Sequence, residues 1–370
     1  MLYPEPLHKG DRVAIVSLSS GILGEAFCAH EKELGVQRME AFGLKPVFTA
    51  HALDGVQEVW SHPENRASDL KAAFLDDSIR GIITAIGGID TFRTFPYLME
   101  DEEFISAVRE HPKIFLGFSD STNNHLMFYR LGLQTFYGQS FLPDIAELSA
   151  DMLSYSKEQF ASCFAPYHGR RIMPAPVWYE ERKDFSPAAV GTDPVSHPEQ
   201  HGYELLQGKP QFEGELLGGC IDSMGEMLLD DRAEYYAEKL RSCGLTDTDV
   251  FRSQGEIARR YNIFPSAGEW KGKILFAETS EDQPKPERLA EFLSAFRKAG
   301  VFDQINGILV GKPLNEQYYE EYKSVWREAV GNPEIPILYN INIGHAAPRV
   351  ILPYGAAARV DAEKQEILLL

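Results

Sequence analysis

The chain has 370 residues, of which 44% are hydrophobic and 25% are charged, and its formal net charge is -19. This length allows a sizeable core and suggests two domains, or one large domain with an insertion. The negative charge argues against binding to nucleic acid, which requires clustered Lys and Arg, and against binding to an anionic membrane surface.

The cysteines and the N-terminus indicate a cytoplasmic protein. Cys28, Cys163, Cys220 and Cys243 lie far apart, with no C-x-x-C pair. Neither a zinc knuckle nor a disulfide framework is therefore expected. The N-terminus has no basic segment followed by a long apolar one, and no apolar run approaches about 18 residues. We expect reduced thiols and no membrane-spanning segment.

Strands and helices alternate over residues 1–145. The pattern predicts strands at 13–18, 46–50 and 114–118, a strand within 81–92 that ends in Gly87-Gly88, and helices at 25–42, at 63–77 and after residue 120. This alternation is typical of an open, doubly wound α/β sheet, whose ligands bind outside the carboxyl ends of the strands. Gly87 and Gly88 lie at such an end. The glycine pair is not part of a dinucleotide-binding or Walker motif, since neither motif is present. It forms either a tight turn or a place where a backbone N–H can approach a reacting carbonyl.

Ser119 lies where the strand 114–118 breaks into a helix. Gly117 leaves room at the turn, and the backbone N–H of Asp120 points to the same edge of the sheet, which would supply half of an oxyanion hole. The motif departs from G-x-S-x-G, because Ser121 replaces the second glycine. Since Ser, Asp and Asn are also preferred helix N-caps, a simple capped helix start remains an alternative to a nucleophile.

Residues 146–214 show little periodicity and are rich in Pro, Gly, His and aromatic residues. We expect an interdomain linker and a long loop that covers the site. Trp178 and Tyr179 in this loop either stack on a flat substrate group or anchor the loop to the core. The pair His197 and His201 resembles H-E-x-x-H only superficially, because proline follows the first histidine, and we expect no metal there.

Residues 215–370 predict a second α/β domain with a small β subdomain. The expected strands are 272–278, 307–313 and 335–343, the expected helices are 286–299 and 316–330, and short strands fill the tail. A second glycine pair, Gly218 and Gly219, opens this part of the chain.

A serine nucleophile requires a base and a residue that orients the base. His345 follows a buried strand directly after Gly344, whereas the other histidines lie in polar loops or in helices. Glu278 ends another apolar strand, and Glu281 and Asp282 are nearby competitors further into the loop. The sequence therefore predicts a Ser119, Glu278 and His345 triad for nucleophilic acyl transfer.

Several motifs together resemble the LD-carboxypeptidase family of serine peptidases, and most closely its microcin C immunity branch. The motifs are "PENRASDLKAAFLDDSIRGIITAIGGID", "IFLGFSDSTNNHL", "GELLGGC", "ILFAETSEDQP", "GILVGKP" and "NIGHAAPRVILPYGAAARVD". The resemblance implies a metal-free, cofactor-free cytoplasmic homodimer with a flavodoxin-like or Rossmann-like N-terminal domain.

The same resemblance implies the site residues. The nucleophile falls on Ser119, its partners on Glu278 and His345, and the oxyanion donors on Asp120 and Gly88. The expected substrate-binding residues are Gly87, Trp178, Gly219 and Asp282.

The expected substrate is either an aminoacyl-nucleotide toxin or an LD-linked muropeptide that loses D-Ala. The chain departs from the family in having Cys220 where many relatives have Asn, and Gln139 where Pro is usual. These departures leave the substrate open. A non-catalytic small-ligand-binding protein and a nucleotide-dependent oxidoreductase or kinase are the weaker alternatives.

Overall fold

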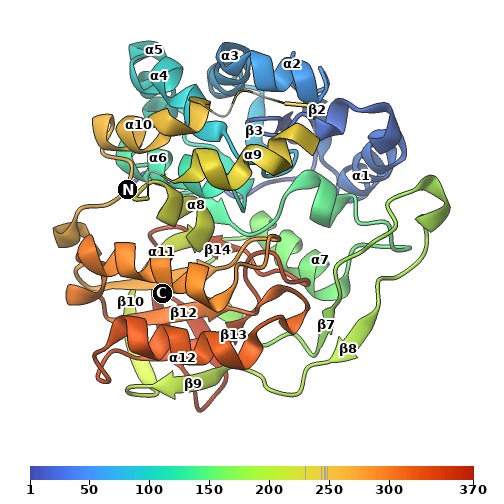
Figure 1. Cartoon of the computed structure of the whole chain (residues 1–370). Helices are drawn as coiled ribbons and strands as arrows, with labels where there is room; N and C mark the ends of the chain where they lie inside the picture. The colour runs from blue at the N-terminus through green and yellow to red at the C-terminus, as the bar shows by residue number, and fades with distance from the viewer. Residues whose placement is uncertain (230, 243, 246, 248) are drawn as a thin grey trace.

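The computed structural model describes residues 1–229, 231–242, 244–245, 247 and 249–370. It contains two large sheets, one in each half of the chain, as Figure 1 shows with the blue and green half above the orange and red half. The predicted α/β class with an open parallel sheet in the first half is confirmed.

The first sheet has the strand order β14-β5-β4-β3-β1-β2. Its strands are β1 (Arg12–Val16), β2 (Lys45–Phe48), β3 (Ile79–Thr84), β4 (Ile114–Gly117), β5 (Phe136–Tyr137) and β14 (Leu352–Pro353). All neighbours are parallel except β5 and β14. The helices of this half are α1 (Ala29–Ala41), α2 (Val56–Ser61), α3 (Pro63–Leu75), α4 (Phe95–Met99), α5 (Glu102–Glu110) and α6 (Ser121–Leu131). Strands β1, β3 and β4 are almost fully buried, as expected for a parallel sheet with helices on both faces, whereas β2 at the edge is partly exposed.

The second sheet has the order β6-β16-β15-β10-β11-β12-β13-β9. Its long strands are β10 (Gln211–Cys220), β11 (Lys273–Glu278), β12 (Gly307–Gly311), β13 (Ile337–Ile341), β15 (Ala357–Asp361) and β16 (Glu366–Leu369). The central strands β10 to β13 are parallel, and the edges are antiparallel. The helices are α8 (Ile221–Glu226), α9 (Arg232–Ser242), α10 (Gln254–Arg260), α11 (Pro286–Lys298) and α12 (Tyr319–Val330).

Residues 146–214 are more regular than the sequence predicts. They contain α7 (Ser154–Ala161) and the short strands β6 (Arg171–Ile172), β7 (Val177–Tyr179), β8 (Ser196–Pro198) and β9 (Glu204–Gln207). Strands β6 and β9 form the two edges of the second sheet, and β7 and β8 pair as a hairpin that extends to the right in Figure 1. Strands this short carry almost no periodic signal, because two to four residues do not complete an alternating pattern.

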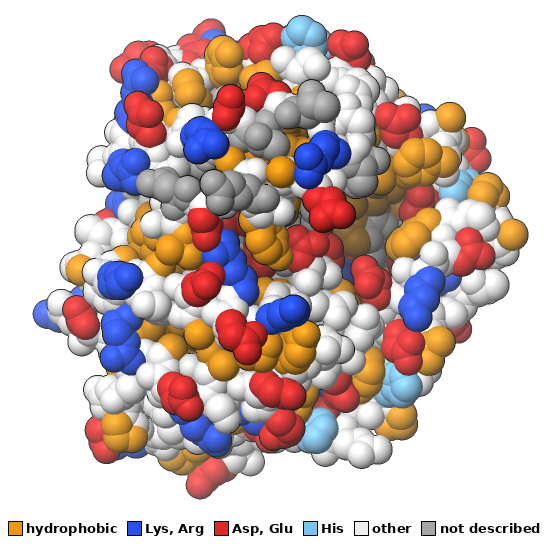
Figure 2. Space-filling model, in the orientation of Figure 1, with side chains coloured by type: hydrophobic (Ala, Val, Ile, Leu, Met, Phe, Trp, Pro, Cys, Tyr) orange, Lys and Arg blue, Asp and Glu red, His pale blue; other side chains and the backbone are white. Residues whose placement is uncertain are grey.

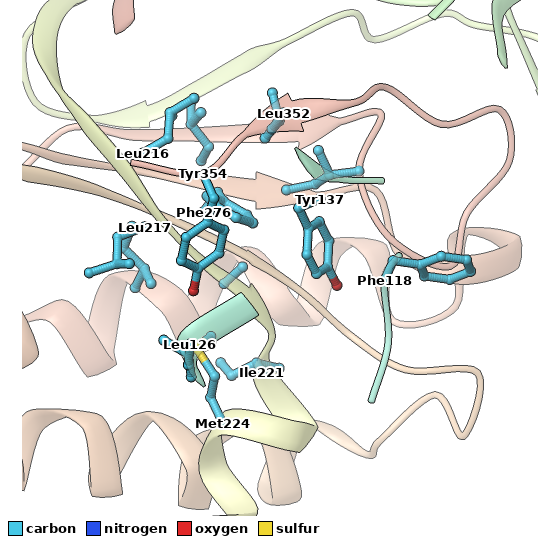
Figure 3. Packing of buried hydrophobic residues seen from close by; sticks show 14 of the residues in the cluster. Phe118, Leu126, Tyr137, Leu216, Leu217, Ile221, Met224, Phe276, Leu352 and Tyr354 are labelled. Carbon is cyan, nitrogen blue, oxygen red and sulfur yellow. The ribbon is translucent and has the colours of Figure 1, made fainter. Parts of the chain in front are cut away.

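The two sheets share one buried interface. Leu126 and Tyr137 of the first half lie there beside Met224 and Phe276 of the second half (Figure 3). The Tyr137 and Phe276 ring centroids are 5.2 Å apart. Strand β14 lies after β13 in sequence but joins the first sheet, so the chain crosses from one sheet to the other between residues 341 and 352. The predicted divisions at residues 145 and 214 stay predictions.

Cys28, Cys163 and Cys220 are buried free thiols, and Cys243 lies outside the described residues. Within the described part of the chain, none of the helices combines the length and apolar composition that crossing a lipid bilayer requires.

Candidate active site

Ser119 lies in a strained turn between β4 and α6. Its φ of 62° is left-handed, which is unusual for a residue other than glycine and typical of functional sites. A Cβ on Gly117 would lie 2.7 Å from Thr84 Oγ1, so glycine is required where the strand ends. The N-cap of α6 is Asp120, with no side-chain capping bond. The Ser119 hydroxyl therefore does not cap this helix.

The Ser119 hydroxyl faces an imidazole that contacts a carboxylate. Ser119 Oγ lies 3.1 Å from His345 Nε2, and His345 Nδ1 lies 2.7 Å from Glu278 Oε2. The same carboxylate oxygen accepts the backbone N–H of His345 at 3.2 Å. Glu278 is the last residue of β11, and His345 follows β13. The three side chains predicted from the sequence thus form one continuous hydrogen-bonded chain, with the geometry of a serine hydrolase triad.

Tyr137 fixes the other oxygen of this carboxylate. Its hydroxyl donates to Glu278 Oε1 at 2.6 Å and accepts the backbone N–H of Ser119 at 3.3 Å. Burial and the nearby Glu278 raise the pKa of Tyr137 well above its ordinary value, so the phenol remains a donor. The sequence analysis missed this residue. Strand β5, which carries it, has two residues and gives no periodic signal in the sequence.

Two backbone N–H groups beside Ser119 are available to an oxyanion. Neither Asp120 nor Gly88 donates its backbone N–H to any acceptor among the described residues. Gly87 makes the close approach possible, because a Cβ there would lie 2.7 Å from Ser119 Cβ and 2.8 Å from Oγ. Gly88 has a φ of 146°, which favours glycine. This geometry is the one that oxyanion stabilisation requires.

A buried polar network holds these N–H groups in place. The Asp120 carboxylate accepts hydrogen bonds from Ser19 Oγ at 2.7 Å and from the Thr91 backbone N–H at 2.8 Å. Ser19 also contacts Asp90, which forms a two-pronged ion pair with Arg66 at 2.9 and 3.0 Å. Burial raises the pKa of Asp120. The network links the loop after β1, the glycine pair and the turn at Ser119, and no pattern in the sequence indicates it.

The triad opens into a cleft of about 570 Å³ between the two halves of the molecule. Its apolar wall includes Phe27, Tyr179 and Phe185, and the side chains of Phe27 and Phe185 are more than half exposed. The carboxylates on the wall are Glu31, Glu147, Glu180, Glu181 and Glu281. Red acidic side chains surround the recess to the right of centre in Figure 2.

Both guanidinium groups that line the described cleft, those of Arg182 and Arg349, are hydrogen-bonded to other groups of the protein. Arg182 contacts Glu147 Oε1 and the oxygens of Thr192. Arg349 donates to Asp144 Oδ1 at 2.8 Å and to the carbonyl oxygens of Gly344 and His345. The cleft therefore presents a net negative charge to an entering ligand.

Carboxylates also set the charge state of the base. Burial lowers the pKa of His345, but Glu278 and then Glu281 raise it more strongly, to about 10. Glu281 Oε2 lies 3.0 Å from His345 Nε2, the nitrogen that faces Ser119. The triad at rest is therefore biased towards a charged imidazolium.

Three predicted substrate-binding residues do not line this cleft as far as the structure describes it. The Trp178 ring stacks on His197 with centroids 4.4 Å apart, and Lys312 lies 5.0 Å from its centroid. Gly219 packs against α6, where a Cβ would lie 2.5 Å from Thr122 Cγ2. Asp282 is exposed beyond the end of β11. A direct role of these residues in binding stays a prediction, whereas Gly87 and Tyr179 lie on the cleft wall.

One group of donor atoms among the described residues could hold a metal ion. Atoms of Cys220, Glu278 and His345 lie within 4.8 Å of one another. Glu278 and His345 are already bonded to each other, and burial and the neighbouring acids raise the pKa of the Cys220 thiol well above its ordinary value. Because a thiol must lose its proton to bind a metal, we assign no metal role to this group. His197 contacts Glu180 at 2.9 Å, in the β7–β8 hairpin.

Comparison with known proteins identifies the family. Models of the LD-carboxypeptidase N-terminal and C-terminal domains match residues 13–138 and 213–360. A protein of Synechocystis sp. that is named as a carboxypeptidase is 30% identical over 98% of this chain and 95% of its own. A Bacillus subtilis protein named as a murein peptide carboxypeptidase is 25% identical over 99% of this chain and 93% of its own.

Solved structures that resemble this chain support the same family assignment. An MccF-like protein from Streptococcus pneumoniae in complex with AMP is 47% identical, with a TM-score of 0.89 over 97% of this chain and 98% of its own. The microcin C7 self immunity protein in complex with aspartyl sulfamoyl adenosine shares the fold, with 20% identity and a TM-score of 0.79 over 100% and 98% of the two chains. The chain is a hydrolase and belongs to the LD-carboxypeptidase family of serine peptidases.

Proposed function

We propose that this enzyme hydrolyses the amide bond of aminoacyl nucleotides through an acyl-Ser119 intermediate. The observation that carries the proposal is the chain of contacts from Ser119 Oγ through His345 to Glu278, at 3.1 and 2.7 Å. The AMP complex of the 47% identical MccF-like protein supports the nucleotide part.

The proposed reaction has two halves. Ser119 Oγ attacks the acyl carbonyl while His345 Nε2 takes the hydroxyl proton, and Glu278 stabilises the resulting imidazolium. The backbone N–H groups of Asp120 and Gly88 receive the oxyanion. The nitrogen of the nucleotide leaving group then departs with the proton from His345. Water, activated by the same imidazole, releases the amino acid from Ser119.

One feature of the cleft favours a nucleotide over a peptide. The exposed rings of Phe27 and Phe185 suit a flat purine, since aromatic faces bind nucleobases by stacking.

A second candidate is the release of D-Ala from an LD-linked muropeptide. Its support is the Bacillus subtilis relative that is named as a murein peptide carboxypeptidase. The same serine, base and oxyanion donors would serve both reactions. The intact hydrogen-bonded chain at Ser119 argues against a non-catalytic binding protein. The expected homodimer and cytoplasmic location stay predictions.

The test compares two classes of substrate and three forms of the protein. Alanyl and aspartyl sulfamoyl adenosine and an LD-linked tetrapeptide are each incubated with wild type, Ser119→Ala and Ser121→Ala. We expect turnover of the adenosines, a loss of about 10⁴-fold or more in Ser119→Ala, and activity within about tenfold of wild type in Ser121→Ala. Turnover of the tetrapeptide alone would replace the first proposal by the second. Turnover of neither would refute both.

A further inference from the structure

One carboxyl group on the described wall of the cleft is buried, that of Glu31. The residue is 7% exposed and lies in the first turn of α1. The other carboxylates on this wall are half-buried or exposed, and they belong to Glu147, Glu180, Glu181 and Glu281. Since acids are rarely buried without a partner, Glu31 is the carboxyl group of the cleft whose position calls for an explanation.

The contacts of Glu31 leave its carboxyl group with a weak donor. Within the described part of the chain, the Cys28 thiol is the one group that hydrogen-bonds it, and a thiol donates weakly. His30 and Arg182 affect its pKa through their charges, but their nitrogen atoms bond other groups. His30 Nε2 donates to the Phe185 carbonyl oxygen, and Arg182 bonds Glu147 and Thr192. A ligand that donates an N–H would therefore supply what this buried acceptor lacks.

Two aromatic rings flank this carboxyl group. Phe27 precedes Glu31 by four residues, in the 3-10 helix Ala26–Cys28 that continues into α1, so the two side chains share one helical face. Phe185 comes from the loop after β7, and its carbonyl oxygen lies 3.0 Å from Nε2 of His30, the neighbour of Glu31. Both rings are more than half exposed, and both line the cleft together with Glu31. A flat ring that stacks on either of them can place its edge against the carboxyl group.

The chemistry of the carboxyl group selects the edge that it can bind. An ionised carboxylate only accepts hydrogen bonds, and a neutral carboxyl group keeps one carbonyl oxygen as an acceptor. Burial raises the pKa of Glu31, but an acceptor is present in either form. The 6-amino group of adenine donates N–H bonds, and amide or acid side chains read amino groups of bases in this way. A purine with hydrogen in place of this amino group has no donor there.

We propose that Glu31 is a specificity-determining residue, which accepts a hydrogen bond from the 6-amino group of an adenine base while Phe27 or Phe185 stacks on the ring. The proposal rests on the proposed hydrolysis of aminoacyl nucleotides and adds the part of the leaving group that the cleft reads. A site built to accept an N–H discriminates against an analogue that lacks it, because its buried polar group is then left unpaired.

The test measures binding without turnover. Calorimetry at pH 7 compares the binding to Ser119→Ala of alanyl sulfamoyl adenosine and of its purine riboside analogue, which carries hydrogen in place of the 6-amino group. We expect the adenosine compound to bind about tenfold or more tightly. The preference should vanish in Ser119→Ala/Glu31→Met, which keeps a side chain of similar length. It should persist in the control Ser119→Ala/Glu33→Gln, since Glu33 is an exposed acid of the same helix outside the described cleft wall.

Kinetics separate reading of the base from a structural role. In the enzyme that retains Ser119, Glu31→Met should lower the ratio of kcat/KM for the adenosine compound to that for its analogue by about tenfold or more. Glu31→Gln should restore much of this ratio, because its amide oxygen can still accept the N–H. An equal fall for both compounds in Glu31→Met would overturn this inference.

Two binding outcomes distinguish this inference from the proposed function. Equal affinities of the two compounds for Ser119→Ala would overturn the role of Glu31 and leave the proposed function standing. Failure of folded Ser119→Ala to bind either compound would refute the proposed function, and this inference with it.

Discussion

Replacing Tyr137 with Phe tests whether the buried carboxylate of Glu278 depends on its second hydrogen bond. The substitution removes only the hydroxyl that donates to Glu278 Oε1 at 2.6 Å. The other oxygen keeps its contacts with His345. Because Glu278 is 2% exposed, water cannot replace the lost donor without a rearrangement.

The magnitude follows from the kind of bond that is lost. A hydrogen bond to a charged group contributes about 1.5 to 3 kcal/mol. If this hydrogen bond supports Glu278 in stabilising the imidazolium that forms in the transition state, its loss should lower kcat/KM by about 10- to 150-fold, since each 1.36 kcal/mol corresponds to about tenfold. The loss should appear in kcat rather than in KM, because Tyr137 lies behind the triad and outside the cleft wall. The free energy of unfolding should fall by about 1 to 3 kcal/mol.

Tyr354→Phe is a matched control. Tyr354 is as fully buried as Tyr137, contacts the same Phe276 ring, and donates its hydroxyl to the Gly218 carbonyl oxygen at 2.8 Å. It should lose about 1 kcal/mol of stability and little activity. Steady-state kinetics with an aminoacyl sulfamoyl adenosine and urea unfolding measure both variants. A Tyr137→Phe protein that is folded and retains wild-type kcat would refute the role assigned to this hydroxyl.

Two further predictions concern the nucleophile and the base. Gly87→Ala should displace Ser119, since the new Cβ would lie 2.8 Å from its Oγ, and kcat/KM should fall by about 10²-fold. The control Gly268→Ala should keep its kcat/KM, because a Cβ there meets no atom within 4 Å. Equal kinetics of the two variants would contradict the displacement of Ser119. Because Glu278 and Glu281 outweigh burial and raise the pKa of His345 to about 10, protonation of His345 stabilises the fold fully below about pH 6.5, and this stabilisation is lost as the pH rises through about 10. Since catalysis needs the neutral imidazole, kcat/KM should increase over the same interval, and a profile from pH 6 to 10 that is already level above about pH 7 would disprove the assignment.

Much of the fold could be predicted because its elements are long and periodic. The buried strands at 79–84, 114–117 and 307–311 are apolar runs between loops, and α3 and α11 lie within two residues of their expected ends. The short strands in residues 171–207 were missed, because edge pairing depends on partners that are distant in sequence.

The candidate site likewise contains residues that the sequence predicts and residues that only the three-dimensional structure reveals. Ser119 and His345 follow apolar strands and Glu278 ends one, but these strands belong to two different sheets, so strand-end placement nominated each residue and the family resemblance predicted their meeting. Tyr137 and the Arg66 and Asp90 pair are visible only in three dimensions, because their partners lie 24 to 141 residues away. The prediction for Trp178 rests on its aromatic character and on the family resemblance of its loop, and neither indicates that its ring packs against His197.

The crossing of the chain between the sheets bears on how the molecule is synthesised. The general base is 226 residues after the nucleophile, and it lies on the segment that runs from β13 to β14. Until residues 352–353 leave the ribosome, β5 is an open edge of the first sheet, exposed to pairing with other chains. Until His345 has also been synthesised Ser119 has no base, so a nascent chain, or one truncated before residue 345, lacks the triad. The order of translation itself keeps the enzyme silent until both sheets are joined.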